Sequence, residues 1–395
     1  MNTVKPDDLA DLIPFMTAFR HDLHAHPELG FEETRTAGKV ADSLRQAGLE
    51  VHESIGGTGV VGLLRKGSGN RAIGFRADMD ALPLDETGTP GYASRHPGRM
   101  HACGHDGHTS MLLGAARHLA QHGRFDGTVV FIFQPNEENG LGAQAMLNDG
   151  LFERFPVEEV YALHNLPGEP LGAISTRPGT ICSSESLFEI TIAARGGHSA
   201  MPHRGVDAIL VGSELVQALQ SIVARKLEPG SGGVVSVTEF ITDGRRNVLP
   251  GTATLKGDVR ARTPAERETI RDAMQRLSDG LAAAHDVSVQ FSFETEFIET
   301  LNGEAPTEAL AAASRSLGLT TRANREPMPF SEDFAHLSSA VPGCFALIGN
   351  GTEGANGQPL HATDYDFNDA LLPIGAALWC RLAEERLNPE SDHHA

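Results

Sequence analysis

Three histidines, a cysteine and an aspartate occur within eight residues of the chain, in the segment His101-Ala-Cys-Gly-His-Asp-Gly-His108. Thiolate and imidazole groups are the usual protein ligands of zinc and similar metals. A single histidine is more often a core residue than a ligand, but a cluster of this density favours metal binding. The same residues also allow a second chemistry, in which Cys103 is a nucleophile activated by His101 or His105.

Two adjacent glutamates follow the apolar run Val129–Phe133, in the segment Gln134-Pro-Asn-Glu137-Glu138. A buried carboxylate is costly unless a cation or a proton accompanies it. Neighbouring side chains of an extended chain point in opposite directions, so one glutamate can hold a metal while the other reaches a water molecule. If no other part of the chain supplied a metal site, two solvated loop glutamates would be the simpler interpretation.

Three further histidines stand in distinctive surroundings. His164 closes a short apolar strand, His198 follows two glycines, and His361 precedes a helix among several aspartates. Taken alone, His164 predicts a core residue and His198 a turn. The aspartates near His361 predict capping and surface roles, with Asp369 as the helix N-cap.

The first half of the chain alternates helical and strand patterns. We expect helices at 8–26, 34–47 and 108–122, and strands at 59–64, 72–76, 128–134 and 160–164. Such alternation is typical of an α/β layer with a largely parallel sheet. Ligand sites in these sheets gather at the carboxyl ends of the strands.

The middle of the chain has a different pattern. We expect strands at 188–194, 234–241, 252–262 and 287–293, and helices at 207–224 and 264–284. The order strand-helix-strand-strand-helix-strand is the split βαβ pattern. It predicts a second domain at residues 186–298, inserted into a first domain formed by residues 1–185 and 299–395, which ends in a helix at 370–386.

Bulk composition narrows the functional classes. The 395 residues carry a formal net charge of −20 and no run of Lys or Arg, which argues against nucleic acid or an anionic membrane as partner. The first residues lack a signal-peptide pattern, the apolar runs are too short to span a bilayer, and four scattered cysteines are too few for a disulfide framework. We therefore expect a cytoplasmic protein.

Taken together, the motifs resemble the aminoacylase and hippurate hydrolase family of metallopeptidases, which also includes auxin-conjugate hydrolases. The segments that carry the resemblance are RADMDALP (76–83), HACGHDGH (101–108), QPNEENGLGA (134–143), LHNLPG (163–168), GGHSAMPH (196–203), NVLP (247–250), SEDF (331–334) and LHATDYDFND (360–369). The resemblance runs from about Leu23 to the last helix. It implies a mixed-sheet α/β catalytic domain of the zinc-peptidase type, with a ferredoxin-like α+β dimerisation and lid domain inserted at 186–298.

The resemblance also implies roles for single residues. The implied ligands of two divalent metal ions (Zn, Mn, Co or Ni) are Cys103, His105, Glu138, His164 and His361. Glu137 is implied as the general base, Asp80 as a residue that orients a ligand, and His198 and Asn247 as substrate-binding residues. His198 is implied to act across a dimer formed through the smaller domain.

The implied reaction is hydrolysis of the amide bond of small N-acyl amino acids, such as hippurate or N-acetyl amino acids, to a carboxylic acid and a free amino acid. A dipeptidase or carboxypeptidase using the same site, and a hydrolase dependent on Cys103, are the alternatives. The chain departs from its relatives at Asn136 and Asn139, which flank the glutamate pair, and at Arg245-Arg246. Arginines at 245, 246, 260 and 262 are candidates to bind the substrate carboxylate.

Overall fold

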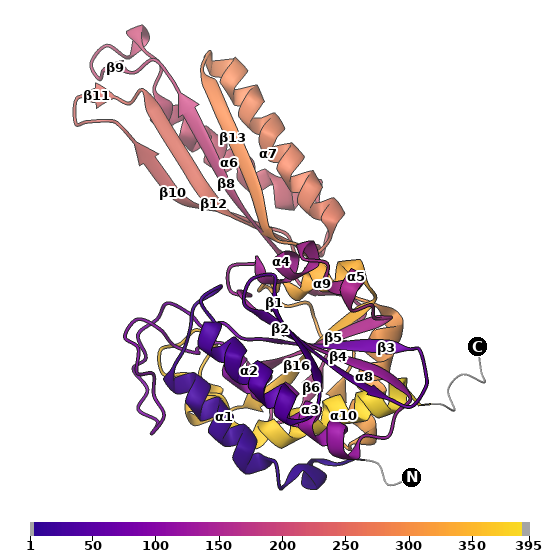
Figure 1. Ribbon diagram of the computed structural model, residues 1–395. Coiled ribbons are helices and arrows are strands. Elements are labelled where there is room, and N and C mark those ends of the chain that lie inside the picture. The colour runs from indigo at the N-terminus through magenta and orange to yellow at the C-terminus, as the bar shows by residue number, and fades with distance from the viewer. Residues whose placement is uncertain (1–3, 389–395) are drawn as a thin grey trace. The chain divides into compact units, whose positions relative to one another are not determined.

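The computed structural model describes residues 4–388, which form two compact units (Figure 1). Unit 1 comprises residues 4–181, 301–326 and 333–388, and unit 2 comprises residues 182–300 and 327–332. The sequence placed the inserted domain at 186–298. The additional piece of unit 2, at 327–332, is too short to carry a periodic pattern of its own.

Unit 1 is built on one eight-stranded sheet with the strand order β1-β2-β4-β3-β5-β16-β6-β15. The strands are β1 (Glu50–Ile55), β2 (Gly59–Lys66), β3 (Ala72–Asp78), β4 (Gly127–Gln134), β5 (Glu159–Pro167), β6 (Ile174–Ser175), β15 (Thr321–Arg322) and β16 (Gly343–Gly351). The four central strands, β4, β3, β5 and β16, run parallel to one another. Their carboxyl ends therefore meet at one edge of the sheet. The mixed-sheet α/β class that was expected is confirmed.

Helices cover the sheet of unit 1 (Figure 1). They are α1 (Ile13–Ala25), α2 (Thr34–Gln46), α3 (His105–His122), α4 (Gly142–Asn148), α5 (Leu151–Arg154), α8 (Glu304–Ser316), α9 (Phe334–Ala340) and α10 (Leu372–Arg386). The long helix α3 packs against α1, α10 and β3. All eight residues of β4 are buried, as expected for a parallel strand covered on both faces.

Three predictions about local structure in unit 1 were wrong or incomplete. The helix expected at 8–26 begins as a separate 3-10 turn, Pro6–Leu9, before α1. Strand β16 was missed because its sequence, GCFALIGNG, contains three glycines and looks like a turn. Asp369 is not the N-cap, because the Asn368 side chain accepts the hydrogen bond from the backbone N–H of Ala370 instead.

Unit 2 contains the predicted element order. Its main elements are β8 (Ser184–Ala193), α6 (Ala208–Lys226), β10 (Val234–Thr242), β12 (Thr252–Ala261), α7 (Pro264–His285) and β13 (Ser288–Phe297). The four strands form an antiparallel sheet in the order β10-β12-β8-β13. A separate two-stranded antiparallel sheet, the β9–β11 sheet, pairs β9 (Gly197–His198) with β11 (Val248–Leu249), which lies about fifty residues further along the chain.

Local signals explain where the helices of unit 2 begin. The Asp207 side chain accepts a hydrogen bond from the backbone N–H of Ile209 at the start of α6. Thr263 caps α7 in the same way, and Pro264 occupies the first helical position, where a missing N–H costs nothing. Across the described residues of both units, none of the helices combines the length and apolar character that a bilayer crossing requires.

Candidate metal centre

The predicted metal ligands of unit 1 come from segments that leave the carboxyl edge of the sheet or lie close to it. Cys103 and His105 stand at the start of α3, and Glu138 follows the end of β4. His164 lies near the end of β5, and His361 lies in the segment after β16. Segments far apart in the sequence are thus brought to one edge, as is usual for ligand sites of parallel sheets.

The donor atoms of these residues lie close together. Within one group, the ligand atoms of Cys103, His105 and His164 are all within 4.8 Å of one another, and the same holds for Cys103, Glu138 and His361. The Cys103 Sγ is 3.3 Å from His164 Nε2, and His361 Nε2 is 3.5 Å from Glu138 Oε2. The structure therefore brings all five predicted ligands into one cluster.

The predicted base, Glu137, belongs to the same cluster. Its Oε2 lies 3.9 Å from His105 Nε2, and its side chain is almost fully buried. Its Oε1 accepts a long hydrogen bond of 3.4 Å from the backbone N–H of Asp333. One carboxylate oxygen of Glu137 therefore faces the donor atoms, while the other accepts a hydrogen bond from the backbone.

Buried polar atoms in this cluster indicate that cations belong there. His105 Nε2 and Glu138 Oε1 are buried, lie 3.9 Å apart, and have no hydrogen-bond partner among the described residues. Burial raises the pKa of Glu138 to about 8, although His105 opposes this. A carboxylate in this position needs a positive charge to stay ionised at neutral pH. The mixed set of thiolate, imidazole and carboxylate groups fits zinc-like divalent ions.

Asp80 orients two of the predicted ligands at once. His105 Nδ1 lies 2.9 Å from the backbone carbonyl oxygen of Asp80 and 3.2 Å from its Oδ1. The other carboxylate oxygen of Asp80 accepts a 3.0 Å hydrogen bond from the backbone N–H of Glu138. Contacts of this kind to the second ring nitrogen are usual for histidines that bind metals.

The charges around His105 also favour bound cations. Burial lowers its pKa, but Asp78, Asp80 and Glu138 outweigh this effect and raise the value to about 10. The site thus carries an excess of negative charge. Bound cations would balance that charge, and they require His105 to be deprotonated.

His361 is held by its backbone and not by the packing of its side chain, which is 52% exposed. Its φ of 66° is left-handed, which is uncommon for a bulky residue. Its backbone N–H donates a 2.9 Å hydrogen bond to the carbonyl oxygen of Ala102, next to Cys103. Backbone strain of this kind costs about 1–3 kcal/mol and is concentrated at functional sites.

Sequence reasoning missed the buried network below the predicted ligands. Asp78 Oδ1 lies 2.6 Å from His108 Nδ1, and Arg76 Nη1 donates a 2.7 Å hydrogen bond to Asp78 Oδ2. Arg76 also donates a 3.0 Å hydrogen bond to Asp333. Charged residues at alternate positions of the buried strand β3 are the signal that could have revealed this network.

His198 and Asn247, the predicted substrate-binding residues, lie together in unit 2. His198 pairs with Val248 across the β9–β11 sheet, and the backbone N–H of Ser199 donates a 3.1 Å hydrogen bond to the carbonyl oxygen of Asn247. His198 and Asn247 are both exposed. This small sheet therefore brings an imidazole and an amide from distant segments near each other.

The candidate arginine anchors differ in their availability. Arg260 forms ion pairs of 2.7 Å with Glu185 and 2.9 Å with Asp258, so its charge is already used within unit 2. Arg245 and Arg246 are exposed. This difference makes Arg260 the weakest of these candidates.

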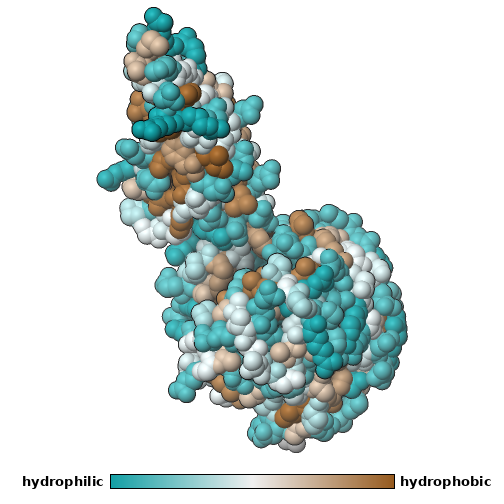
Figure 2. All heavy atoms as spheres, turned by 90° about the vertical axis from the view of Figure 1, so that its left-hand side faces the viewer, coloured by the Kyte–Doolittle hydropathy of each residue, from teal (hydrophilic) through white to brown (hydrophobic). Residues whose placement is uncertain are grey.

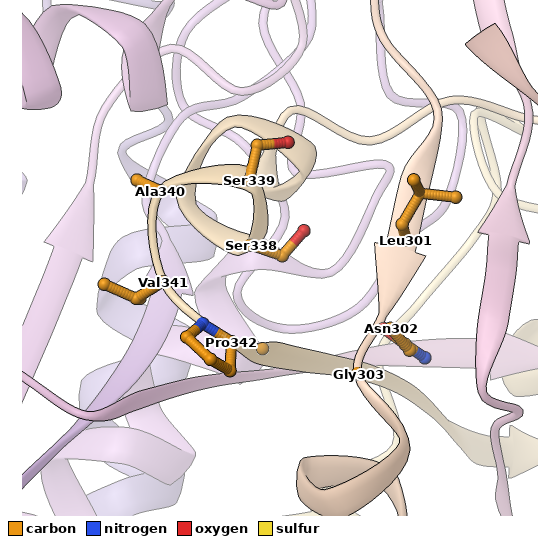
Figure 3. A pocket seen from close by; sticks show the side chains of 9 residues that line it. Leu301, Asn302, Gly303, Ser338, Ser339, Ala340, Val341 and Pro342 are labelled. Carbon is orange, nitrogen blue, oxygen red and sulfur yellow. The ribbon is translucent and has the colours of Figure 1, made fainter.

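A separate cavity of unit 1 is not part of this chemistry (Figure 3). Its volume is about 440 Å³, and it is lined by residues 301–303 and 338–343, which include no His, Cys, Asp or Glu. The Asn302 side chain donates hydrogen bonds to Thr176 and to the carbonyl oxygen of Phe345, so it serves to join strands.

Comparison with known proteins agrees with the geometry. Residues 74–385 match peptidase family M20/M25/M40. The chain belongs to this family. The hippurate hydrolase of Campylobacter jejuni is 37% identical over 95% of this chain and 97% of its own length. The IAA-amino acid hydrolase ILR1-like 5 of Arabidopsis thaliana is 35% identical over 95% of this chain and 88% of its own.

A solved structure shows the same arrangement of the M20 fold. The Bacillus subtilis YXEP protein, described as a dinuclear metal binding peptidase of the M20 family, matches with a TM-score of 0.85. It is 30% identical, and the match covers 96% of this chain and 99% of that one. The family resemblance seen in the motifs is therefore confirmed, and the chain is a hydrolase that acts on amide bonds.

Proposed function

We propose that this M20 protein is a metal-dependent amidohydrolase that cleaves small N-acyl amino acids to a carboxylic acid and a free amino acid. The observation that carries the proposal is the convergence of five donor side chains and a separate glutamate at one edge of the sheet. The substrates in the names of two relatives, hippurate and IAA-amino acid, support the same substrate class.

The residues that would hold two divalent ions are Cys103, His105, Glu138, His164 and His361. When bound, such ions polarise the substrate carbonyl and make water easier to deprotonate. Glu137 accepts the proton of the attacking water and passes it to the leaving nitrogen. The hydrogen bond that Glu137 Oε1 accepts from the Asp333 N–H keeps Glu137 Oε2 directed at the donor cluster during this transfer.

We assign substrate binding to His198 and Asn247. Both are exposed and lie beside the β9–β11 sheet, so an imidazole and an amide are available to hydrogen-bond a carbonyl or a carboxylate. We assign no metal binding to His198 or Asn247. Their loss should therefore change substrate affinity and not metal content.

We also propose that two copies of the chain associate through unit 2. Strand β10 pairs with β12 on one side, and no described strand pairs with its other edge. Val234, Phe240 and Ile241 on β10 are 44%, 40% and 50% exposed, and Figure 2 shows apolar surface gathered on unit 2. An apolar open edge of this kind favours pairing with another strand, here the same edge of a second copy.

One experiment separates the proposed function from its alternatives. Purified protein is analysed for metal, treated with a chelator, and then resupplied with Zn²⁺, Mn²⁺, Co²⁺ or Ni²⁺. Hydrolysis of hippurate, N-acetyl amino acids and dipeptides is measured at each stage. We expect about two metals per chain, loss of activity on chelation, recovery with metal, and preference for N-acyl amino acids. Activity that survives complete metal removal would favour the Cys103 nucleophile, and preference for dipeptides would favour a dipeptidase.

A further inference from the structure

Glu33, a buried glutamate, contacts the segment that carries the predicted base. The residue stands directly before α2 and its side chain is fully buried. Its Oε1 accepts a 2.8 Å hydrogen bond from the backbone N–H of Asn136, and its Oε2 accepts one from the Thr58 hydroxyl. Asn136 immediately precedes Glu137, so this side chain reaches within one residue of the base.

Glu33 does not act as a helix cap, despite its position. Its side chain makes no hydrogen bond to the first turn of α2. That task belongs to Glu28, whose carboxylate accepts hydrogen bonds of 3.0 Å from the backbone N–H of Arg35 and 2.7 Å from that of Thr36. Two acids of the same loop thus have different partners, which leaves the contact of Glu33 with Asn136 to be explained.

The backbone at Asn136 needs support from its neighbours. Its φ is 48°, a left-handed conformation that Asn tolerates better than most residues. The Asn139 side chain donates a hydrogen bond to Asn136 Oδ1, so the two asparagines that flank the glutamate pair contact each other. Gly30 lies so close that an added Cβ would be 1.7 Å from Asn136 Oδ1. The turn before the base is therefore enclosed on several sides.

We infer that Glu33 is a positioning residue that holds the turn at Asn136 and thereby sets the direction of the Glu137 carboxylate. This inference rests on the proposed role of Glu137 as base. Without the acceptor, the buried N–H of Asn136 would lose its partner, and an unpaired buried donor is costly enough to shift the turn. A shift of about 1 Å in a reacting group can cost on the order of a hundredfold in rate.

The contact requires an acceptor oxygen and not a charge. Burial raises the pKa of Glu33 to about 7, so a large part of this carboxyl is already protonated near neutral pH. A glutamine at this position offers a carbonyl oxygen to Asn136 and an amide to the Thr58 hydroxyl. Glu33→Gln should therefore work where Glu33→Ala fails.

The test compares Glu33→Ala, Glu33→Gln and Glu28→Ala with the wild-type holoenzyme on hippurate or the best N-acyl substrate. We expect Glu33→Ala to lower kcat by about ten- to a hundredfold. Its KM should stay within about twofold and its metal content should not change. Glu33→Gln should keep at least a third of the wild-type kcat. Glu28→Ala, the matched control, should lower the melting temperature while kcat is unchanged.

Several outcomes would overturn the inference. If Glu33→Ala has the wild-type kcat at temperatures below its melting temperature, where it is folded, Glu33 has a structural role only. A Glu33→Gln enzyme as poor as Glu33→Ala contradicts the hydrogen-bond argument. If Glu33→Ala does not fold, Thr58→Val takes its place: a lower kcat at unchanged KM supports the role, and an unchanged kcat contradicts it. Glu137→Gln is measured in parallel. If Glu137→Gln remains active, the proposed base is wrong. If Glu137→Gln is inactive but Glu33→Ala keeps the wild-type kcat, Glu137 can still be the base and only the positioning role of Glu33 is refuted.

Discussion

The metal centre of unit 1 and the β9–β11 sheet of unit 2 both carry predicted functional residues, but they hold these residues differently. In the centre, His105 and Glu138 are oriented by Asp80, and Glu137 by the Asp333 N–H. In the β9–β11 sheet, His198 and Asn247 are exposed and depend on the pairing of two residues in each strand. The comparison indicates that buried contacts hold the residues of unit 1 in place for the chemical step, whereas His198 and Asn247 stand on a short exposed sheet.

The largest effect is expected from removing a donor that two groups of ligands share. Cys103→Ala takes the only thiolate from the cluster, so most of the metal should be lost and turnover should fall to background. Cys344→Ala is the matched control, because burial raises the pKa of the Cys344 thiol to about 11 and Cys344 lies outside these groups. Metal analysis and activity are measured together. Full metal content in Cys103→Ala would contradict the assignment of Cys103 as a metal ligand.

A smaller effect is expected from Asp80→Ala, which removes the side chain that orients two ligands. Metal affinity should fall by about ten- to a hundredfold, the usual range for a partner of a metal ligand. Competition with a chromophoric chelator measures this affinity. Unchanged affinity would mean that the backbone carbonyl of Asp80 is sufficient to orient His105.

Substitution in the β9–β11 sheet should affect the enzyme differently from substitution in the metal centre. His198→Ala should lower kcat/KM by roughly tenfold, the worth of one hydrogen bond to the substrate. Metal content and metal affinity should be unchanged, and the ranking of acyl groups should shift. If His198→Ala loses metal, His198 contributes to the metal centre and the two regions are not distinct in function. If His198→Ala keeps the wild-type kcat/KM on every substrate, His198 does not bind substrate.

Association through unit 2 should be weakened without harm to the metal centre. Ile241→Lys places a charge on the apolar edge of β10, so a dimer should dissociate at concentrations where the wild type stays associated. Analytical ultracentrifugation measures the change, with Lys256→Ala on the neighbouring strand as control. A wild-type chain that is monomeric at all concentrations contradicts this interface.

The smallest effect on activity, but a clear one on stability, is expected from His24 beside the centre. Burial lowers its pKa, but hydrogen bonds with Asp106 and Glu86 outweigh this and raise it from 6.5 to about 9. This stabilisation is complete below pH 6.5 and is lost as pH rises through 9. The free energy of unfolding should fall by roughly 3 kcal/mol across this window. Denaturant titrations at several pH values measure it, and His24→Gln should remove most of the slope.

The residues of the donor cluster could be predicted because several of them stand in short motifs that contain more than one chemical group. Cys103 and His105 share one such motif and Glu137 and Glu138 share another, and the periodic patterns of unit 2 predicted the order of its elements. The missing parts depend on contacts between distant segments. Glu33 and Asn136 are 103 positions apart, and no local pattern near either residue predicts their hydrogen bond. Strand β16 was missed because three of its nine residues are glycines, which are typical of turns.

The proposed function depends on Glu137 transferring protons beside a metal centre that other residues hold. Glu137→Gln separates these two roles, because the change removes the base and keeps the shape of the side chain. We expect kcat to fall by about a hundred- to ten-thousandfold, with full metal content and unchanged thermal stability. If Glu137→Gln keeps kcat within a few-fold of the wild type, or loses its metal, Glu137 is not the base that we propose.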